Sequence, residues 1–91
     1  TDRLYRENPD VPRVALRAEL ARLLRCSVVV IPAEPGDVIG HADGVVRFLN
    51  DRTVAVNDYS KLDPEYGRRL GRVIERAGLR AEPVPYCPVD E

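Results

Sequence analysis

The stretch from Thr53 to Pro85, TVAVNDYSKLDPEYGRRLGRVIERAGLRAEPVP, decides the fold of this chain. It opens with a short β-branched run, Thr53 to Asn57, which is typical of a strand. Asp63-Pro64-Glu65 then combines an acidic N-cap, a proline in the first turn and an early acid, so it predicts a helix, which Gly78 closes. Ala81 to Pro85 is typical of a last short strand. The stretch therefore predicts a strand, a helix and a second strand.

The predicted helix has one apolar face. Its apolar residues recur at helical spacing: Tyr66, Leu70, Val73, Ile74 and Ala77. Arginines and Glu75 occupy the opposite face, so we expect the apolar stripe to pack on a sheet. Gly67 and Gly71 each cost a helix roughly 1 kcal/mol relative to alanine, so we expect close packing of that helix on a sheet or a neighbouring segment to offset the cost.

A β-hairpin is predicted immediately before this stretch. His41 to Leu49 has an extended pattern, and Asn50-Asp51-Arg52 supplies turn chemistry between it and the Thr53 strand. Side chains alternate in a strand, so this pattern predicts that His41, Asp43, Val45 and Arg47 share one face. The order from residue 41 to 85 is therefore β-β-α-β.

The N-terminal part predicts one more helix and one more strand. Val11 to Arg25 is typical of a helix whose leucines, Leu16, Leu20, Leu23 and Leu24, fall on one face. The β-branched run Ser27 to Ile31, bounded by Pro32, predicts a buried strand. Ala33 to Gly40 is expected to be a loop, and Pro83 to Glu91 resembles the start of a linker. We expect an α/β (α+β) chain in which residues 11–32 precede the unit of residues 41–85.

Length and composition limit the classes of protein. The chain has 91 residues, 14 basic and 15 acidic side chains, and a net charge of −1. One small domain is expected, with no basic surface for nucleic acid and no apolar run of the length a membrane span needs. The two cysteines are too few for a disulfide scaffold, so a reducing cytoplasm is expected. Because the chain begins at Thr1 and contains no methionine, we expect a partial domain, an internal piece of a longer chain.

The segment Gly40 to Phe48, GHADGVVRF, holds the side chains best suited to chemistry. The carboxylate of Asp43 can accept two parallel N–H bonds from a guanidinium group. The imidazole of His41 titrates near neutral pH and can protonate a leaving amine and later deprotonate water. Neither role needs a metal or cofactor, and a metal site of His41, Asp43 and Asp37 lacks any dedicated ligand spacing. A purely structural alternative is a His41–Asp43 hydrogen bond with Arg47 bridging to Asp43.

Neither cysteine is placed as an activated nucleophile. Cys26 follows a predicted helix C-terminus, whose negative dipole end raises a thiol pKa. Cys87 lies between Tyr86 and Pro88, near the end of the sequence. A site for guanidinium chemistry built on His41 and Asp43 therefore still lacks a nucleophile.

Several segments together resemble one enzyme family. In chain order they are Thr1-Asp2-Arg3, Arg6-Glu7-Asn8-Pro9, Gly40-His41-Ala42-Asp43-Gly44 with Arg47-Phe48, Val56-Asn57-Asp58-Tyr59-Ser60, and Pro83-Val84-Pro85-Tyr86. This pattern resembles the agmatine deiminase and bacterial-type peptidylarginine deiminase family of guanidino-group modifying enzymes. The resemblance runs the length of the chain, and its most specific part is the G-H-x-D-G-x-x-R-F segment.

The resemblance implies a fold and a reaction. The fold is a five-bladed α/β propeller of the pentein type, in which residues 41–85 would form one β-β-α-β blade and residues 11–32 the helix and strand of the preceding blade. The reaction converts a guanidinium group to a ureido product and ammonia through a cysteine thiolate. His41 and Asp43 match the catalytic H-x-D positions, with Asp43 also clamping the substrate. The cysteine and an upstream acidic partner would lie elsewhere, so the 91 residues alone are expected to be inactive.

The substrate and the class remain open at the level of sequence. Gly44 stands where agmatine deiminases usually have Asn, so arginine or peptidyl-arginine competes with agmatine, the precursor in putrescine and polyamine synthesis. Arg47 is a candidate partner for a substrate carboxylate. The alternatives are an amidino-transfer enzyme of the same superfamily and a non-catalytic α/β module for binding or oligomerisation. The expected partner is a small guanidino compound, with neither nucleic acid nor membrane, and self-association is left open.

Overall fold

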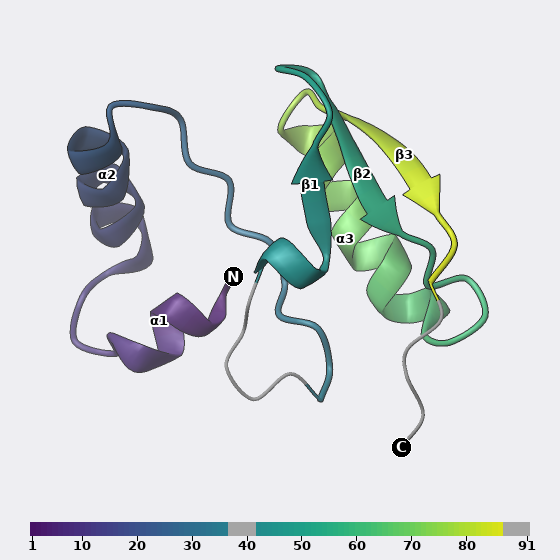
Figure 1. Cartoon of the computed structure of the whole chain (residues 1–91). Helices are drawn as coiled ribbons and strands as arrows, with labels where there is room; N and C mark the ends of the chain where they lie inside the picture. Colours follow the sequence, from purple (N-terminus) through teal and green to yellow (C-terminus); the bar gives the residue numbers. More distant parts are fainter. Residues whose placement is uncertain (37–41, 87–91) are drawn as a thin grey trace.

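The computed structural model describes residues 1–36 and 42–86 and has a mixed α+β fold (Figure 1). Its elements are α1 (Arg3–Glu7), α2 (Arg13–Leu24), the 3-10 turn η1 (Ala42–Gly44), β1 (Val46–Phe48), β2 (Thr53–Asn57), α3 (Pro64–Arg76) and β3 (Arg80–Val84). In the described part of the chain no helix has the length and apolar character needed to cross a bilayer.

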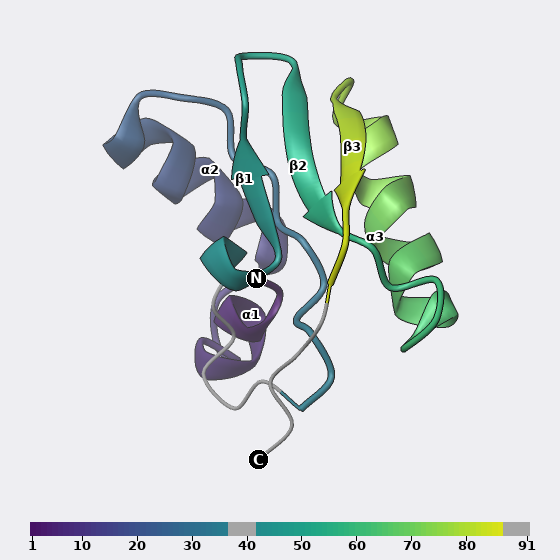
Figure 2. The same ribbon diagram turned by 45° about the vertical axis from the view of Figure 1, so that its right-hand side comes forward.

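The predicted β-β-α-β unit is confirmed. The sheet has the order β1-β2-β3, with β1 antiparallel to β2 and β3 parallel to it. The side-chain Oδ1 of Asn50 accepts hydrogen bonds from the backbone N–H groups of Arg52 and Thr53, both at 2.9 Å, which closes the hairpin turn. Helix α3 carries the chain from β2 back to β3 and lies along one face of the sheet (Figures 1 and 2).

Helix α3 begins and ends where the sequence predicts. Asp63 Oδ1 accepts a hydrogen bond from the backbone N–H of Tyr66 at 3.1 Å, and Pro64 occupies the first turn. Gly78 has a φ of +76°, a left-handed conformation that favours glycine after a helix end. The apolar stripe is buried at Tyr66, Leu70 and Ile74, which join the core with Ile31, Val45, Val54, Val56 and Tyr59.

The two helical glycines differ. A Cβ atom added at Gly67 would lie 3.2 Å from the Cβ atom of Tyr59, which is tighter than ordinary packing. The expected close packing of the helix is therefore confirmed, and Gly67 lies at a point of close approach. Gly71 lies beside open space instead, because an added Cβ there meets nothing within 4 Å.

The N-terminal helices only partly follow the sequence prediction. Helix α2 forms, but none of its residues is buried, and Leu23 and Leu24 are 62% and 63% exposed. Its leucine face therefore has no core to cover in the described residues. Helix α1 was not predicted; its signal is the pair Arg3 and Glu7, whose side chains meet at 3.1 Å one helical turn apart.

The predicted strand from Ser27 to Ile31 is wrong. This segment pairs with no strand of the described sheet, and only Ile31 in it is buried. The Ile31 carbonyl oxygen instead accepts a hydrogen bond from the backbone N–H of Asp2 at 2.8 Å. A β-branched run forms a strand only when a neighbouring strand satisfies its backbone groups, and no strand of the described residues pairs with it.

The strand predicted from His41 to Leu49 is shorter than expected. It is confined to Val46–Phe48, because the chain from Ala42 to Gly44 forms a 3-10 turn. The backbone N–H of Val45 donates to the carbonyl oxygen of Ala42 at 3.0 Å and closes that turn. A 3-10 turn lacks the alternation of a strand, so the shared face predicted for Asp43, Val45 and Arg47 is wrong.

Candidate functional site

Of the candidate residues in the G-H-x-D-G-x-x-R-F segment, the structure describes Asp43 and Arg47. Asp43 lies in the η1 turn and Arg47 in β1, and both side chains are exposed, whereas Val45 between them is 2% exposed. Among the described residues Asp43 and Arg47 form no ion pair, so the bridging role considered for Arg47 is not found. His41 lies outside the described residues.

The η1 turn is attached to the end of β2 through Asn57. The side-chain Nδ2 of Asn57 donates a hydrogen bond to the carbonyl oxygen of Gly44 at 2.7 Å. The backbone N–H of Asn57 donates to the carbonyl oxygen of Val45 at 3.2 Å. Asp43 is therefore held, through its neighbour Gly44, at the end of the sheet where β2 ends.

A carboxylate with two phenol donors lies at the same end of the sheet. Tyr59 donates its hydroxyl to Glu34 Oε2 at 2.6 Å, and Tyr86 donates its hydroxyl to Glu34 Oε1 at 3.0 Å. Asn57 Nδ2 also lies 3.3 Å from the Tyr59 hydroxyl, to which it donates. We call Glu34, Asn57, Tyr59 and Tyr86 the Glu34 cluster.

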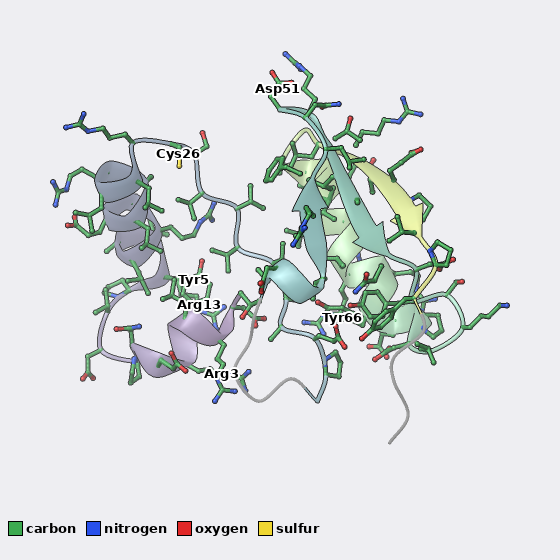
Figure 3. The ribbon with its side chains drawn as sticks, viewed as in Figure 1. Arg3, Tyr5, Arg13, Cys26, Asp51 and Tyr66 are labelled. Atoms are coloured by element: carbon green, nitrogen blue, oxygen red, sulfur yellow. The ribbon has the colours of Figure 1, made fainter. Side chains whose placement is uncertain are left out.

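Aromatic packing fixes the geometry of the Glu34 cluster. The ring of Tyr59 is 4.9 Å from that of Tyr66 and 5.2 Å from that of Tyr86, in edge-to-face arrangements. Tyr66, labelled in Figure 3 at the base of α3, donates its hydroxyl to the carbonyl oxygen of Pro32 at 2.7 Å. The loop that carries Glu34 is thus attached to α3 as well as to the sheet.

Both phenols of the cluster are held in the neutral form. Burial raises the pKa of the Tyr59 phenol, and its hydrogen bond to Glu34 raises that pKa further. The hydrogen bond to Glu34 is also the main cause of a raised pKa at Tyr86. A phenol must keep its proton to donate to a carboxylate, so both tyrosines act as donors at neutral pH.

A groove of about 400 Å³ lies next to the cluster, between α3 and β3. Its wall on α3 is formed by Gly67, Arg68 and Gly71, and Tyr59 also lines it. Asp43 is not among its lining residues, so the groove and the exposed carboxylate of Asp43 are separate features.

Two further kinds of site, a cysteine nucleophile and a group of metal ligands, were considered in the sequence. Cys26 is exposed just after the end of α2 (Figure 3), and Cys87 lies outside the described residues. Within residues 1–36 and 42–86 no three acidic, cysteine or histidine side chains group as metal ligands.

Sequence reasoning missed the role of Glu34. Asn57, Tyr59 and Tyr86 lie in segments that carry the family resemblance, but no pattern connects them to a glutamate in a proline- and glycine-containing loop. The concentration of tyrosines in two of those segments was the available signal. Their common acceptor could be found only from the three-dimensional structure.

Comparisons with protein-family models, with curated proteins and with solved structures found no match to this chain. The class is therefore defined by the geometry described above. Over residues 1–36 and 42–86 it is a small mixed α+β fold in which a three-stranded sheet carries one helix on one face.

Proposed function

We propose that this chain is one β-β-α-β blade, with the segment before it, of a pentein-type guanidine deiminase. The substrate is agmatine or a related guanidino compound such as arginine or peptidyl-arginine. The chain supplies His41 and Asp43 to the site, and the cysteine nucleophile and a second acidic group come from other parts of a longer protein. Alone, these 91 residues do not turn over substrate.

One observation carries this proposal: three segments that bear the family resemblance meet at one end of the sheet. Gly44 of the first is hydrogen-bonded to Asn57 of the second, and Tyr59 of the second packs against Tyr86 of the third. The exposed carboxylate of Asp43 lies beside this junction and is free to accept the two parallel N–H groups of a guanidinium. The β-β-α-β order of the described elements is the order that the resemblance implies.

The proposed reaction balances as a hydrolysis. The thiolate attacks the guanidinium carbon and a C–S bond forms. A C–N bond then breaks, and ammonia leaves with a proton from His41. Water, deprotonated by His41, attacks the same carbon, the C–S bond breaks and the thiolate returns. Asp43 holds the two N–H groups of the guanidinium through both steps, so its contribution is orientation and charge.

The test uses the full-length protein that contains these residues. Agmatine, arginine and a blocked peptidyl-arginine are each supplied, and ammonia and ureido product are measured together. We expect equal amounts of both products from at least one substrate. Asp43→Asn and His41→Ala should each lower the rate at least about 100-fold with unchanged circular dichroism. The matched control, Cys26→Ser, should leave the rate unchanged.

Two outcomes would overturn the proposal. The first is a folded full-length protein that forms no ureido product from any of the three substrates. The second is an Asp43→Asn variant with the rate of the unmodified protein. Transfer of the amidino group to an added amine, without ammonia release, would assign the protein to the amidino-transfer enzymes instead.

The rival function is a non-catalytic binding or oligomerisation module. The observation that favours it is the apolar surface of α2, where Val14, Leu23 and Leu24 are exposed. If the full-length protein is inactive, sedimentation of the protein and of a Leu23→Glu variant tests this function. A concentration-dependent increase in mass that the variant abolishes would support it.

A further inference from the structure

The Glu34 cluster connects parts of the chain that are distant in sequence. Glu34 is 25 residues from Tyr59 and 52 residues from Tyr86, and its two carboxylate oxygens accept from one hydroxyl each. Asn57 is 13 residues from Gly44, whose carbonyl oxygen it holds. Residues on both sides of the stretch 35–43 are therefore attached to the same group of side chains.

The hydrogen bonds of the cluster form a directed chain. The Tyr59 hydroxyl donates to Glu34, which leaves its oxygen as an acceptor for one N–H of the Asn57 amide. The other N–H of the same Nδ2 then points to the carbonyl oxygen of Gly44. The Glu34 carboxylate orients the Tyr59 hydroxyl, and the oxygen of that hydroxyl orients the Asn57 amide. The Glu34 carboxylate therefore fixes the Asn57 amide and, through it, the η1 turn.

The surroundings make this arrangement rigid. Tyr59 is 4% exposed, its ring is held between Tyr66 and Tyr86, and its Cβ faces Gly67. In the described residues every buried side-chain nitrogen and oxygen atom has a hydrogen-bond partner. A hydrogen-bonded network with all its members satisfied holds one geometry more firmly than isolated bonds do.

We propose that the Glu34 cluster is a clamp that positions Asp43 for its substrate. Glu34, Asn57, Tyr59 and Tyr86 are positioning residues: none of them touches the guanidinium group, and each acts through the η1 turn. This role rests on the proposed deiminase function. The clamp itself does not, because it is defined by contacts within the described residues.

The central variant is Tyr59→Phe in the full-length protein. It removes the hydroxyl at the middle of the hydrogen-bond chain and keeps the ring, so the aromatic packing is retained. We expect kcat to fall roughly 10- to 100-fold while KM changes little, because a misplaced carboxylate lowers the fraction of productive complexes. Asn57→Asp keeps the shape of the side chain but cannot donate to Gly44. It should likewise lower kcat and leave KM nearly unchanged.

A double variant tests whether the residues act as one unit. Glu34→Gln and Tyr86→Phe share one contact, so their combination should be no slower than the more damaging single change. Matched controls are Tyr5→Phe, a tyrosine whose ring lies under Arg13, and Glu82→Gln on the exposed strand β3. Both controls should retain the kcat of the unmodified protein.

Hydrogen exchange separates failure of the clamp from failure of the proposed function. The amides of Val45 and Asn57 form hydrogen bonds in and beside η1. They should exchange at least about 10-fold faster in Tyr59→Phe and Glu34→Gln, but not in the controls. Unchanged exchange in both variants would overturn the clamp whatever the activity. Faster exchange in a protein that forms no ureido product would retain the clamp and overturn the deiminase proposal and the assigned role of Asp43.

Discussion

The two glycines of α3 make a matched pair for testing how closely this helix packs. Both lie inside the helix without a left-handed backbone, so alanine fits the backbone at each. Alanine gains about 1 kcal/mol over glycine in a helix interior. An added Cβ at Gly71 meets nothing within 4 Å, so Gly71→Ala should raise the free energy of unfolding by about 1 kcal/mol.

Gly67→Ala should have the opposite effect. Its Cβ would lie 3.2 Å from the Cβ of Tyr59, a buried residue held by hydrogen bonds to Glu34 and Asn57 and by two rings. Tyr59 cannot easily move, so the overpacking costs about 2 kcal/mol. After the gain in helix propensity, the net loss is about 1 kcal/mol, and the two variants should differ by about 2 kcal/mol.

Urea unfolding followed by circular dichroism at 222 nm measures this difference. The slope of the free energy against urea should be the same in both variants, which shows that the unfolded state is unchanged. Equal stabilisation by Gly67→Ala and Gly71→Ala would refute the close approach of α3 to Tyr59. Destabilisation by Gly71→Ala would show that the groove beside it is closed in solution.

Other consequences of the structure are testable with the same unfolding assay. Asp63→Ala removes the cap of α3 and should cost about 1 kcal/mol, whereas Asp63→Asn should cost less. Leu70→Ala, at a fully buried position, should lower the free energy of unfolding by about 2–5 kcal/mol. Val14→Ala, on the exposed surface of α2, should change it by no more than about 0.5 kcal/mol. The raised pKa values of Tyr59 and Tyr86 mean that the unfolded chain loses these protons first as pH rises. Their stabilising contribution is therefore complete below about pH 10 and lost above it. Tyr59→Phe should make the fall in stability above pH 10 shallower, and an unchanged fall would contradict the assignment.

The elements with strong local signals were predicted correctly. Strand β2 has the predicted bounds, and α3 begins at the Asp63 cap and ends before Gly78. Asn50 closes the predicted hairpin turn. Caps, turns and helical periodicity depend on residues a few positions apart, so the local sequence is enough to predict these elements.

The errors occur where the outcome depends on a distant neighbour. The β-branched run that begins at Ser27 has strand propensity but pairs with no strand in the described part of the chain, and the leucine face of α2 finds no core there to cover. The length of β1 was overestimated because Asn57, from the other side of the hairpin, holds Gly44 in a turn. Propensity describes what a segment can form, and these three outcomes depended on what lies next to it.

The sequence by itself determined the β-β-α-β order, the limits of α3 and its buried face, because these follow from local hydrogen bonding and from the periodicity of apolar residues. It also placed Asp43 in the segment Gly40 to Phe48, whose side chains are the best suited to guanidinium chemistry. Only the tertiary structure decided that Glu34 is the common acceptor of Tyr59 and Tyr86, and that this cluster holds the turn carrying Asp43. A hydrogen bond across 52 residues exists only when the whole fold brings its donor and acceptor together, and no local pattern encodes that distance.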